Sequence, residues 1–242
     1  MSTATTASEP ILVAIDGPAG SGKSSVSREA ATRLGFGILD TGAAYRALAW
    51  AALHRGANLD DEQTVMTVLD EWHYTSALRG HPAFSVAFAT DTGTETHDVT
   101  TAIRETRVSS QVSRVSKHPR VRERLNHMFN RMVAESGLPG VVIEGRDITT
   151  VVAPTAPVRI LMTASPEVRA SRRMGELQGA THAQVLADIA ARDAKDAEVV
   201  DFMHPAPGVT LIDTSDLDFE QSVQAVIDIV GAVQTTAEKS AS

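Results

Sequence analysis

Short apolar runs recur along the chain, and segments with helical spacing separate several of them. The first run, residues 11–15 (ILVAI), shows no alternation of polar and apolar positions, which is typical of a parallel strand buried on both faces. Similar runs are found at residues 38–40, 141–144, 158–162 and 209–212. This alternation predicts an α/β fold in which helices cover both faces of a parallel sheet.

Several helices have clear signals at their ends. Residues 23–34 place apolar side chains on one side, and a glycine follows at the position of a helix C-cap. Ser165 is followed by proline and glutamate, a combination that favours a helix N-terminus. Asp218 is expected to open the last helix in a similar way.

Between about Trp72 and Asp98 the pattern changes to short β-rich pieces separated by the turn sequences RGHP and DTG. Such pieces indicate antiparallel strands rather than a crossover unit, so we interpret this region as part of an inserted subdomain. The expected organisation is flexible tails at residues 1–10 and 236–242, a core at residues 11–64 and 138–235, and an insert at residues 65–137.

The composition of the 242 residues, 43% of them apolar, is that of an ordinary globular protein. No apolar run approaches the roughly 20 residues that span a bilayer, and the first ten residues lack the features of a signal peptide. The absence of cysteine excludes disulfides and thiolate chemistry, which fits a reducing cytoplasm. The eight histidines show no metal-ligand spacing.

The formal net charge of −8 argues against a nucleic-acid partner, because affinity for phosphate backbones comes from Lys and Arg. Residues 101–131 reverse this sign locally, with eight basic side chains against two acidic ones, a net of +6. Such a segment suits a small anionic ligand. A solvated helix face with incidental arginines would have the same local charge.

Residues 17–24 (GPAGSGKS) match the phosphate-binding pattern G-x-x-x-x-G-K-S, after a buried strand and at the start of a helix. Glycines let backbone N–H groups turn toward phosphate oxygens, and the helix N-terminus adds partial positive charge. Lys23 is expected to reach the β- and γ-phosphates, and the Ser24 hydroxyl to bind Mg²⁺. The expected contacts with a nucleoside triphosphate, most simply ATP, come from Gly17, Pro18, Ala19, Gly20, Ser21, Gly22, Lys23, Ser24 and Ser25.

Three further stretches are candidates for holding the phosphate acceptor. Residues 39–46 (LDTGAAYR) follow the second apolar run, and residues 143–148 (IEGRDI) close the third. Because strand C-termini line the ligand crevice of open α/β sheets, Thr41, Arg46 and Arg146 are expected near the phosphates. Residues 191–196 (ARDAKD) end a helix that begins near Thr181. Each stretch also has a purely structural interpretation as a capped turn, a surface ion pair or an intrahelical pair, respectively.

The loop alone does not identify the acceptor, because GTPases, motor ATPases, helicases and small kinases all use it. A kinase for UMP, shikimate or gluconate is the nearest alternative. A regulatory NTPase switch, a nucleic-acid-dependent ATPase and a scaffold with a vestigial loop are more distant ones. The acidic net charge and the absence of an evident second motif for guanine count against the switch and the ATPase.

Together these stretches resemble the bacterial cytidylate kinases, the CMP and dCMP kinases of the P-loop nucleoside monophosphate kinase superfamily. Seven motifs follow the family's order over residues 11–215. They are IDGPAGSGKSSVSR, LDTGAAYR, DVTTAIR, VSRVSKHPRVRERL, IEGRDITTVVAP, RILMTASPEVRASRR and RDAKD. The resemblance implies a five-stranded parallel core, an insert that binds the nucleoside monophosphate, and a helical lid near residues 165–196. It also implies transfer of the γ-phosphate of ATP, with Mg²⁺, to CMP or dCMP in pyrimidine nucleotide metabolism.

The resemblance assigns roles to individual residues. Ser113, Arg122 and Asp147 match positions that hold the edge of cytosine, whose donor and acceptor pattern they complement. Arg46 and Arg146 match arginines that hold phosphate, with the Thr41 hydroxyl beside them. Arg192 matches a lid arginine, and Asp196 an aspartate that contacts the sugar. Lys23, Arg146 and Arg192 are the expected catalytic residues, and we expect the enzyme to be a cytoplasmic monomer.

Two positions depart from the family's usual pattern. Val199 stands where a further phosphate-binding arginine is common, and Thr149 stands where glycine is common. Arg169, Arg172 and Arg173 are candidates to supply the missing charge, because all three lie on the expected first helix of the lid.

Overall fold

The computed structural model describes residues 10–175, 181–198, 201 and 203–240. The chain divides into two compact units, residues 1–38 with 132–242 and residues 39–131, and each is described by itself. Among the described residues, no helix is long and apolar enough to cross a membrane.

A five-stranded sheet has the order β2-β6-β1-β7-β8. Strand β1 runs parallel to β6 and β7, and β7 runs parallel to β8. The strands are β1 (Ile11–Asp16), β2 (Gly37–Asp40), β6 (Gly140–Gly145), β7 (Val158–Thr163) and β8 (Thr210–Asp213). The α/β fold with a five-stranded parallel sheet is therefore confirmed, and each predicted strand agrees with the structure to within one residue at either end.

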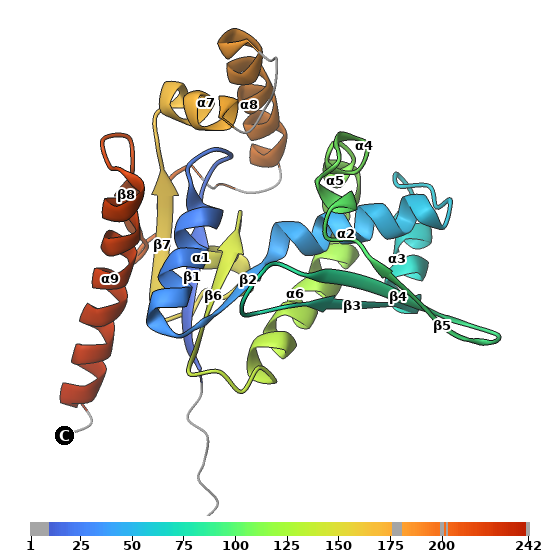
Figure 1. Ribbon diagram of the computed structural model, residues 1–242, viewed down its shortest axis with the longest axis horizontal. Coiled ribbons are helices and arrows are strands. Elements are labelled where there is room, and N and C mark those ends of the chain that lie inside the picture. The colour runs from blue at the N-terminus through green and yellow to red at the C-terminus, as the bar shows by residue number, and fades with distance from the viewer. Residues whose placement is uncertain (1–9, 176–180, 199–200, 202, 241–242) are drawn as a thin grey trace, which may run out of the picture. The chain divides into compact units, whose positions relative to one another are not determined.

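Helices α1 (Lys23–Leu34) and α9 (Phe219–Ser240) pack against each other and against the sheet (Figure 1). Their shared core contains Val26 and Ala30 of α1, Val226 of α9, and Val13 and Ile160 of the sheet. Burying such side chains is the main stabilising contribution to this unit. Helix α9 continues to Ser240, so most of the expected tail at residues 236–242 is helical.

Helices α7 (Pro166–Met174) and α8 (His182–Ala197) pack together and cover most of the expected lid. The Ser165 side chain accepts a hydrogen bond from the backbone N–H of Val168, and Pro166 is the first helical residue, as the sequence predicts. Thr181 caps α8 in the same way, with the N–H of Gln184 as donor. Ala170, Val185 and Ile189 form the small core between the two helices.

The second unit contains an antiparallel sheet in the order β3-β4-β5, which agrees with the expected β-rich region. Its elements are α2 (Thr41–His54), α3 (Glu62–Glu71), β3 (Trp72–Ser76), β4 (Phe84–Thr90), β5 (Gly93–Asp98), the 3₁₀ turn η1 (Ala102–Arg104), α4 (Thr106–Ser109), α5 (Val112–Ser116) and most of α6 (Pro119–Ala134). This unit begins at Leu39, whereas the insert was expected to begin at residue 65, because α2 packs against α3, α4, α5 and β4.

Candidate active site

The loop between β1 and α1 adopts a conformation that requires glycine at several positions. A Cβ atom at Gly17 would lie 2.1 Å from the backbone oxygen of Met162, so no side chain fits there. Gly20 and Gly22 have φ angles of 78° and 86°, in the left-handed region that other residues rarely adopt. A glycine-rich conformation of this kind, directly before a helix, is typical of phosphate-binding loops.

Lys23 and Ser24, the first residues of α1, meet the carboxylate of Glu144 at the end of β6. The Ser24 hydroxyl donates a 2.7 Å hydrogen bond to Glu144 Oε1, and Lys23 Nζ lies 3.9 Å from Glu144 Oε2. Only 5% of the Glu144 side chain is exposed. The sequence analysis assigned no role to Glu144, although an acid at the C-terminal end of a buried strand beside the loop was a usable signal.

Ser21 supports the identification of this loop as an anion site. Its hydroxyl oxygen is buried and has no hydrogen-bond partner among the residues that the structure describes. A buried hydroxyl is normally hydrogen-bonded, so an orphaned one inside a glycine-rich loop is explained by a ligand that supplies the acceptor. A phosphate oxygen is such an acceptor.

Arg146 and Asp147 follow β6 directly and lie beside the same loop. Arg146 Nη1 donates a 2.7 Å hydrogen bond to the carbonyl oxygen of Gly17. Asp147 is 8% exposed, so its carboxylate is held in a largely dry environment. The structure thus brings together two stretches, residues 17–24 and 143–148, that are far apart in the sequence.

A buried aspartate anchors the turn after Asp147. Asp16, the last residue of β1, accepts hydrogen bonds from the backbone N–H groups of Ile148 and Thr149 and from the Thr149 hydroxyl, at 2.7, 2.8 and 2.7 Å. Burial nevertheless raises the pKa of Asp16 above its ordinary value, and these hydrogen bonds oppose that shift. Residues Ile148–Val152 form a π-helical turn, η2, a feature frequent at functional sites. Thr149, which the sequence left unexplained, therefore ties this turn to β1.

The expected lid contacts the loop through three side chains. Arg169 donates to the carbonyl oxygen of Ala19 and forms an ion pair with Asp193 of α8, whose carboxylate also accepts from the Ala19 N–H. Arg172 donates to the carbonyl oxygens of Ser21 and Thr214 at 3.1 and 2.7 Å. Burial lowers the pKa of Arg172 from its ordinary value. Two of the three arginines considered as substitutes for the family's arginine thus hold the loop backbone.

The remaining lid residues of the sequence analysis are only partly described. Arg192 and Asp196 lie on α8, but their side chains are outside the described part of the structure. Val199 also lies outside the described residues. The roles that the resemblance gives to Arg192 and Asp196 therefore stay predictions.

In the second unit, Thr41 and Arg46 lie on the first turns of α2. Asp40 caps this helix by accepting from the Ala43 N–H at 2.7 Å, and its other oxygen lies 3.1 Å from Arg46 Nη2. Arg46 Nε is buried and has no hydrogen-bond partner within the described residues. A buried guanidinium N–H without an acceptor is suited to receive an anionic ligand.

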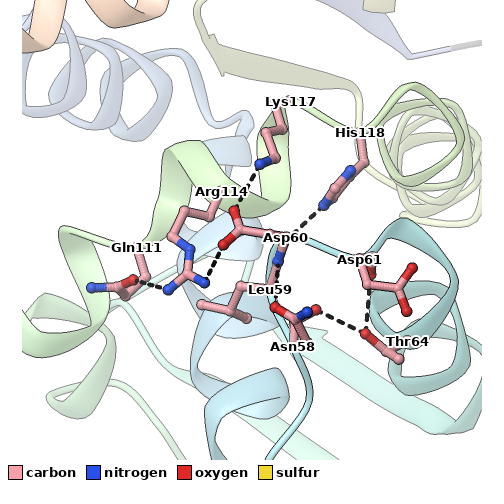
Figure 2. Close-up of polar contacts among 9 residues, drawn as sticks. All are labelled: Asn58, Leu59, Asp60, Asp61, Thr64, Gln111, Arg114, Lys117 and His118. Atoms are coloured by element: carbon pink, nitrogen blue, oxygen red, sulfur yellow. Dashed lines mark hydrogen bonds and ion pairs between the residues drawn. The ribbon is translucent and has the colours of Figure 1, made fainter.

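Ser113 lies on α5 and Arg122 on α6, and an ion-pair cluster holds α5 in place (Figure 2). The Asp60 carboxylate lies between Arg114 and Lys117, forming an ion pair with each of them. His118 Nε2 is 2.8 Å from the carbonyl oxygen of Leu59. We name the nine residues drawn there, 58–61, 64, 111, 114, 117 and 118, the Asp60 cluster.

Much of the positive charge in residues 101–131 is compensated within the second unit. Arg107 pairs with Glu105, Arg114 and Lys117 pair with Asp60, and Arg124 Nη2 lies 3.8 Å from Asp70. The local excess of +6 therefore overstates the charge that this segment offers to a ligand.

The fold and this loop define a class: the chain is a P-loop protein, with a lysine, a serine and a carboxylate gathered at the start of α1. A profile of the family described as cytidylate kinase matches residues 13–232. The chain belongs to the cytidylate kinase family, and the sequence resemblance is confirmed.

Individual relatives agree with this assignment. The chain is 40% identical over 226 residues to a cytidylate kinase of Cutibacterium acnes, covering 91% of this chain and 96% of the relative. It is 39% identical over 221 residues to a cytidylate kinase of Streptomyces avermitilis, covering 91% of this chain and 92% of the relative. It is 40% identical over 224 residues to one of Desulfitobacterium hafniense, covering 90% and 92%.

Proposed function

We propose that this protein transfers the γ-phosphate of ATP to CMP or dCMP, giving CDP or dCDP and ADP. The observation that carries the proposal is the cluster at the P-loop, in which Lys23, Ser24, Glu144 and Arg146 gather at the C-terminal edge of the sheet. The cytidylate kinases to which the chain is similar supply the identity of the acceptor.

The donor end of the site would be held mainly by backbone groups. Backbone N–H groups of residues 19–25 would surround the phosphates, since Pro18 has none, and the orphaned Ser21 hydroxyl would donate to one of their oxygens. Lys23 would neutralise charge on the β- and γ-phosphates. Lys23, Ser24 and Ser25 form the first turn of α1, so the helix places them for such contacts.

The residues at the start of α1 suit Mg²⁺, which prefers oxygen ligands. The Ser24 hydroxyl and the Glu144 carboxylate lie 2.7 Å apart and offer such oxygens beside the loop. We propose that Ser24 binds the ion and that Glu144 orients the serine or an ion-bound water. When bound, Mg²⁺ would neutralise phosphate charge during transfer.

At the acceptor end, Arg46 and Arg146 would hold the phosphate of CMP, with Thr41 beside them. Arg46 has a buried N–H with no acceptor among the described residues, which suits an anionic group. Ser113, Arg122 and Asp147 would read the cytosine edge, whose amino donor and ring acceptors differ from those of uracil.

The chemistry requires no general base from the protein. An oxygen of the CMP phosphate, already anionic at pH 7, would form the new bond to the γ-phosphorus, while the bond to the β,γ-bridging oxygen breaks and ADP leaves. Lys23, Arg146 and the lid residue Arg192 would stabilise the charge on the transferring group, and Asp196 would contact the sugar of the acceptor. Catalysis would then consist of positioning and charge neutralisation.

Release of ADP tests this proposal when ATP and Mg²⁺ are combined with CMP, dCMP, UMP, AMP or shikimate, offered singly. We expect CMP and dCMP to stimulate release strongly, and the other acceptors and a no-acceptor control to give little. Lys23→Ala should lower turnover by about 10²–10³-fold, because it removes a charge that stabilises the transition state. Its thermal unfolding should stay close to that of the wild type.

Stimulation by UMP or shikimate instead of CMP would leave the P-loop assignment intact and overturn the cytidylate acceptor. Near-normal turnover of folded Lys23→Ala would overturn the P-loop assignment itself. We further expect the enzyme to act as a cytoplasmic monomer without nucleic-acid partners.

A further inference from the structure

Three potential metal-ligating side chains meet in the second unit, and none of them has an assigned role in the reaction. His54 is the last residue of α2, and Glu95 and His97 lie two residues apart on β5. Their ligand atoms all lie within 4.8 Å of one another. The histidines show no metal-ligand spacing in the sequence, because only the tertiary structure brings His54 at the end of α2 to Glu95 and His97 on β5.

The strand register explains why Glu95 and His97 turn toward α2. On β4, Phe88 pairs with Glu95 and Val86 pairs with His97, and paired residues of an antiparallel sheet point to the same face. Val86 and Phe88 are fully or almost fully buried, so this is the inner face of the sheet. The Phe88 ring stacks with the His54 ring at 6.3 Å between centroids, which places His54 on that same face.

Two neighbouring features hold the imidazoles in position. The Trp50 ring stacks on His54, with centroids 4.8 Å apart and planes at 9°, which restricts rotation of the imidazole. His97 Nε2 lies 3.0 Å from Glu95 Oε1, yet it is buried and forms no hydrogen bond of acceptable geometry within the described residues. A buried ring nitrogen without such a partner is available as a metal ligand.

The local charge also favours a cation. His54 lies in the last turn of α2, where the helix macrodipole is negative, and Glu95 contributes a carboxylate. The nearby guanidinium of Arg55, which lies 4.8 Å from the centre of the Phe88 ring, pairs with Glu71 at 2.8 Å. Its positive charge is therefore compensated by another carboxylate.

We propose that His54, Glu95 and His97 form a binding site for a borderline divalent ion such as Zn²⁺ or Ni²⁺. Two imidazoles and a carboxylate are a ligand set that Zn²⁺ uses, with water in the fourth position, whereas Mg²⁺ prefers oxygen ligands alone. Ligand atoms about 2 Å from the ion would lie within less than the present 4.8 Å of one another, and the exposed Glu95 side chain has room to close around it. This site is independent of the proposed function.

Metal titration of the full chain without an affinity tag tests this proposal. Calorimetry with Zn²⁺ should give one equivalent per chain, and excess Mg²⁺ should not compete. Glu95→Gln and His97→Gln should each weaken Zn²⁺ binding by at least about tenfold, the effect typical of even an outer-sphere partner of a metal ligand. His73→Gln is the matched control, because His73 is exposed on β3 of the same sheet but is not one of the three ligands.

Fluorescence gives a second readout that locates the ion. Paramagnetic Ni²⁺ at His54 should quench Trp50, which stacks on that ring, and Trp50→Phe should lose this quenching while keeping the calorimetric stoichiometry. Equal weakening by His73→Gln, full competition by Mg²⁺, or wild-type affinity in folded Glu95→Gln and His97→Gln would each overturn the proposal. Circular dichroism of every variant establishes that it is folded.

Discussion

At the scale of single residues, the site depends on buried polar groups that hydrogen-bond or form ion pairs with one another. Asp16 is 3% exposed and would be costly to bury without its three hydrogen bonds from Ile148 and Thr149. The buried carboxylate of Glu144 similarly accepts a hydrogen bond from Ser24 and forms an ion pair with Lys23. Such groups fix the backbone after β6 relative to the P-loop, and thereby the positions of Arg146 and Asp147.

Replacing Thr149 by valine should test this anchoring. The loss of a hydrogen bond to a buried carboxylate should lower the free energy of unfolding by about 1.5–3 kcal/mol. For a chain of this size, each kcal/mol corresponds to about 2–4 °C in Tm. Thr150→Val is the matched control and should change little, because Thr150 is exposed in the same turn.

The effect of Thr149→Val should also depend on pH. The hydroxyl favours the ionised form of Asp16 and so opposes the burial that raises its pKa. The loss of stability should therefore be largest above the folded pKa of Asp16 and shrink as the pH falls through it. Thermal unfolding of both variants across this range measures the difference, and an equal effect of Thr149→Val and Thr150→Val would contradict the anchoring role.

At the scale of elements, short helices of the second unit are fixed by side chains from connecting segments. Helix α5 spans only Val112–Ser116, too short to be stable alone. The Asp60 cluster attaches it to the connection between α2 and α3 (Figure 2). Because α5 carries Ser113, this attachment would position a residue that we propose to contact cytosine.

Asp60→Asn should therefore raise KM for CMP a few-fold while leaving kcat and KM for ATP nearly unchanged.

Hydrogen bonds from Arg114 and Lys117 hold the pKa of Asp60 well below its ordinary value of 3.8. Its contribution to stability is thus complete above pH 3.8 and is lost as the pH falls through the lowered pKa. The Tm difference between wild type and variant should narrow across that window and with added salt.

Glu105→Gln provides the control for Asp60→Asn. Glu105 forms an exposed ion pair with Arg107, which lies on α4 of the same unit. The same steady-state measurements should give unchanged constants for this variant. An equal rise in KM for CMP in both variants would show that Asp60 has no particular positioning role.

At the scale of the whole molecule, charge separates the proposed kinase from the nucleic-acid-dependent ATPase. The net charge is −8, and several basic residues of the segment 101–131 are already paired with Glu105, Asp60 or Asp70. Binding of a polyanion needs many uncompensated Lys and Arg. A small phosphate needs only a few N–H donors, and Arg46, although paired with Asp40, keeps a buried Nε–H without a hydrogen-bond partner among the described residues.

Adding single-stranded DNA or RNA should therefore leave ATP turnover unchanged, whereas CMP in the same assay should stimulate it. Release of ADP measures both effects. Stimulation by nucleic acid that falls steeply with salt would contradict this expectation, because that dependence is the signature of counterion release.

The sequence predicted the architecture well because local patterns encode it. Apolar runs marked all five strands of the parallel sheet, and Ser165 and Thr181 marked the starts of α7 and α8. The glycine pattern of residues 17–24 located the P-loop, since only glycine fits at Gly17. The boundary of the second unit was less predictable, because contacts of α2 with distant segments set it at Leu39.

The sequence by itself determined the fold class, the P-loop and the family, since these depend on periodicity and on residues close together in the chain. The tertiary structure alone brought Glu144 to Ser24, Asp16 to Thr149, and His54 to His97. Such contacts join segments far apart in sequence, and hydrophobic periodicity carries no information about which polar side chains then face each other.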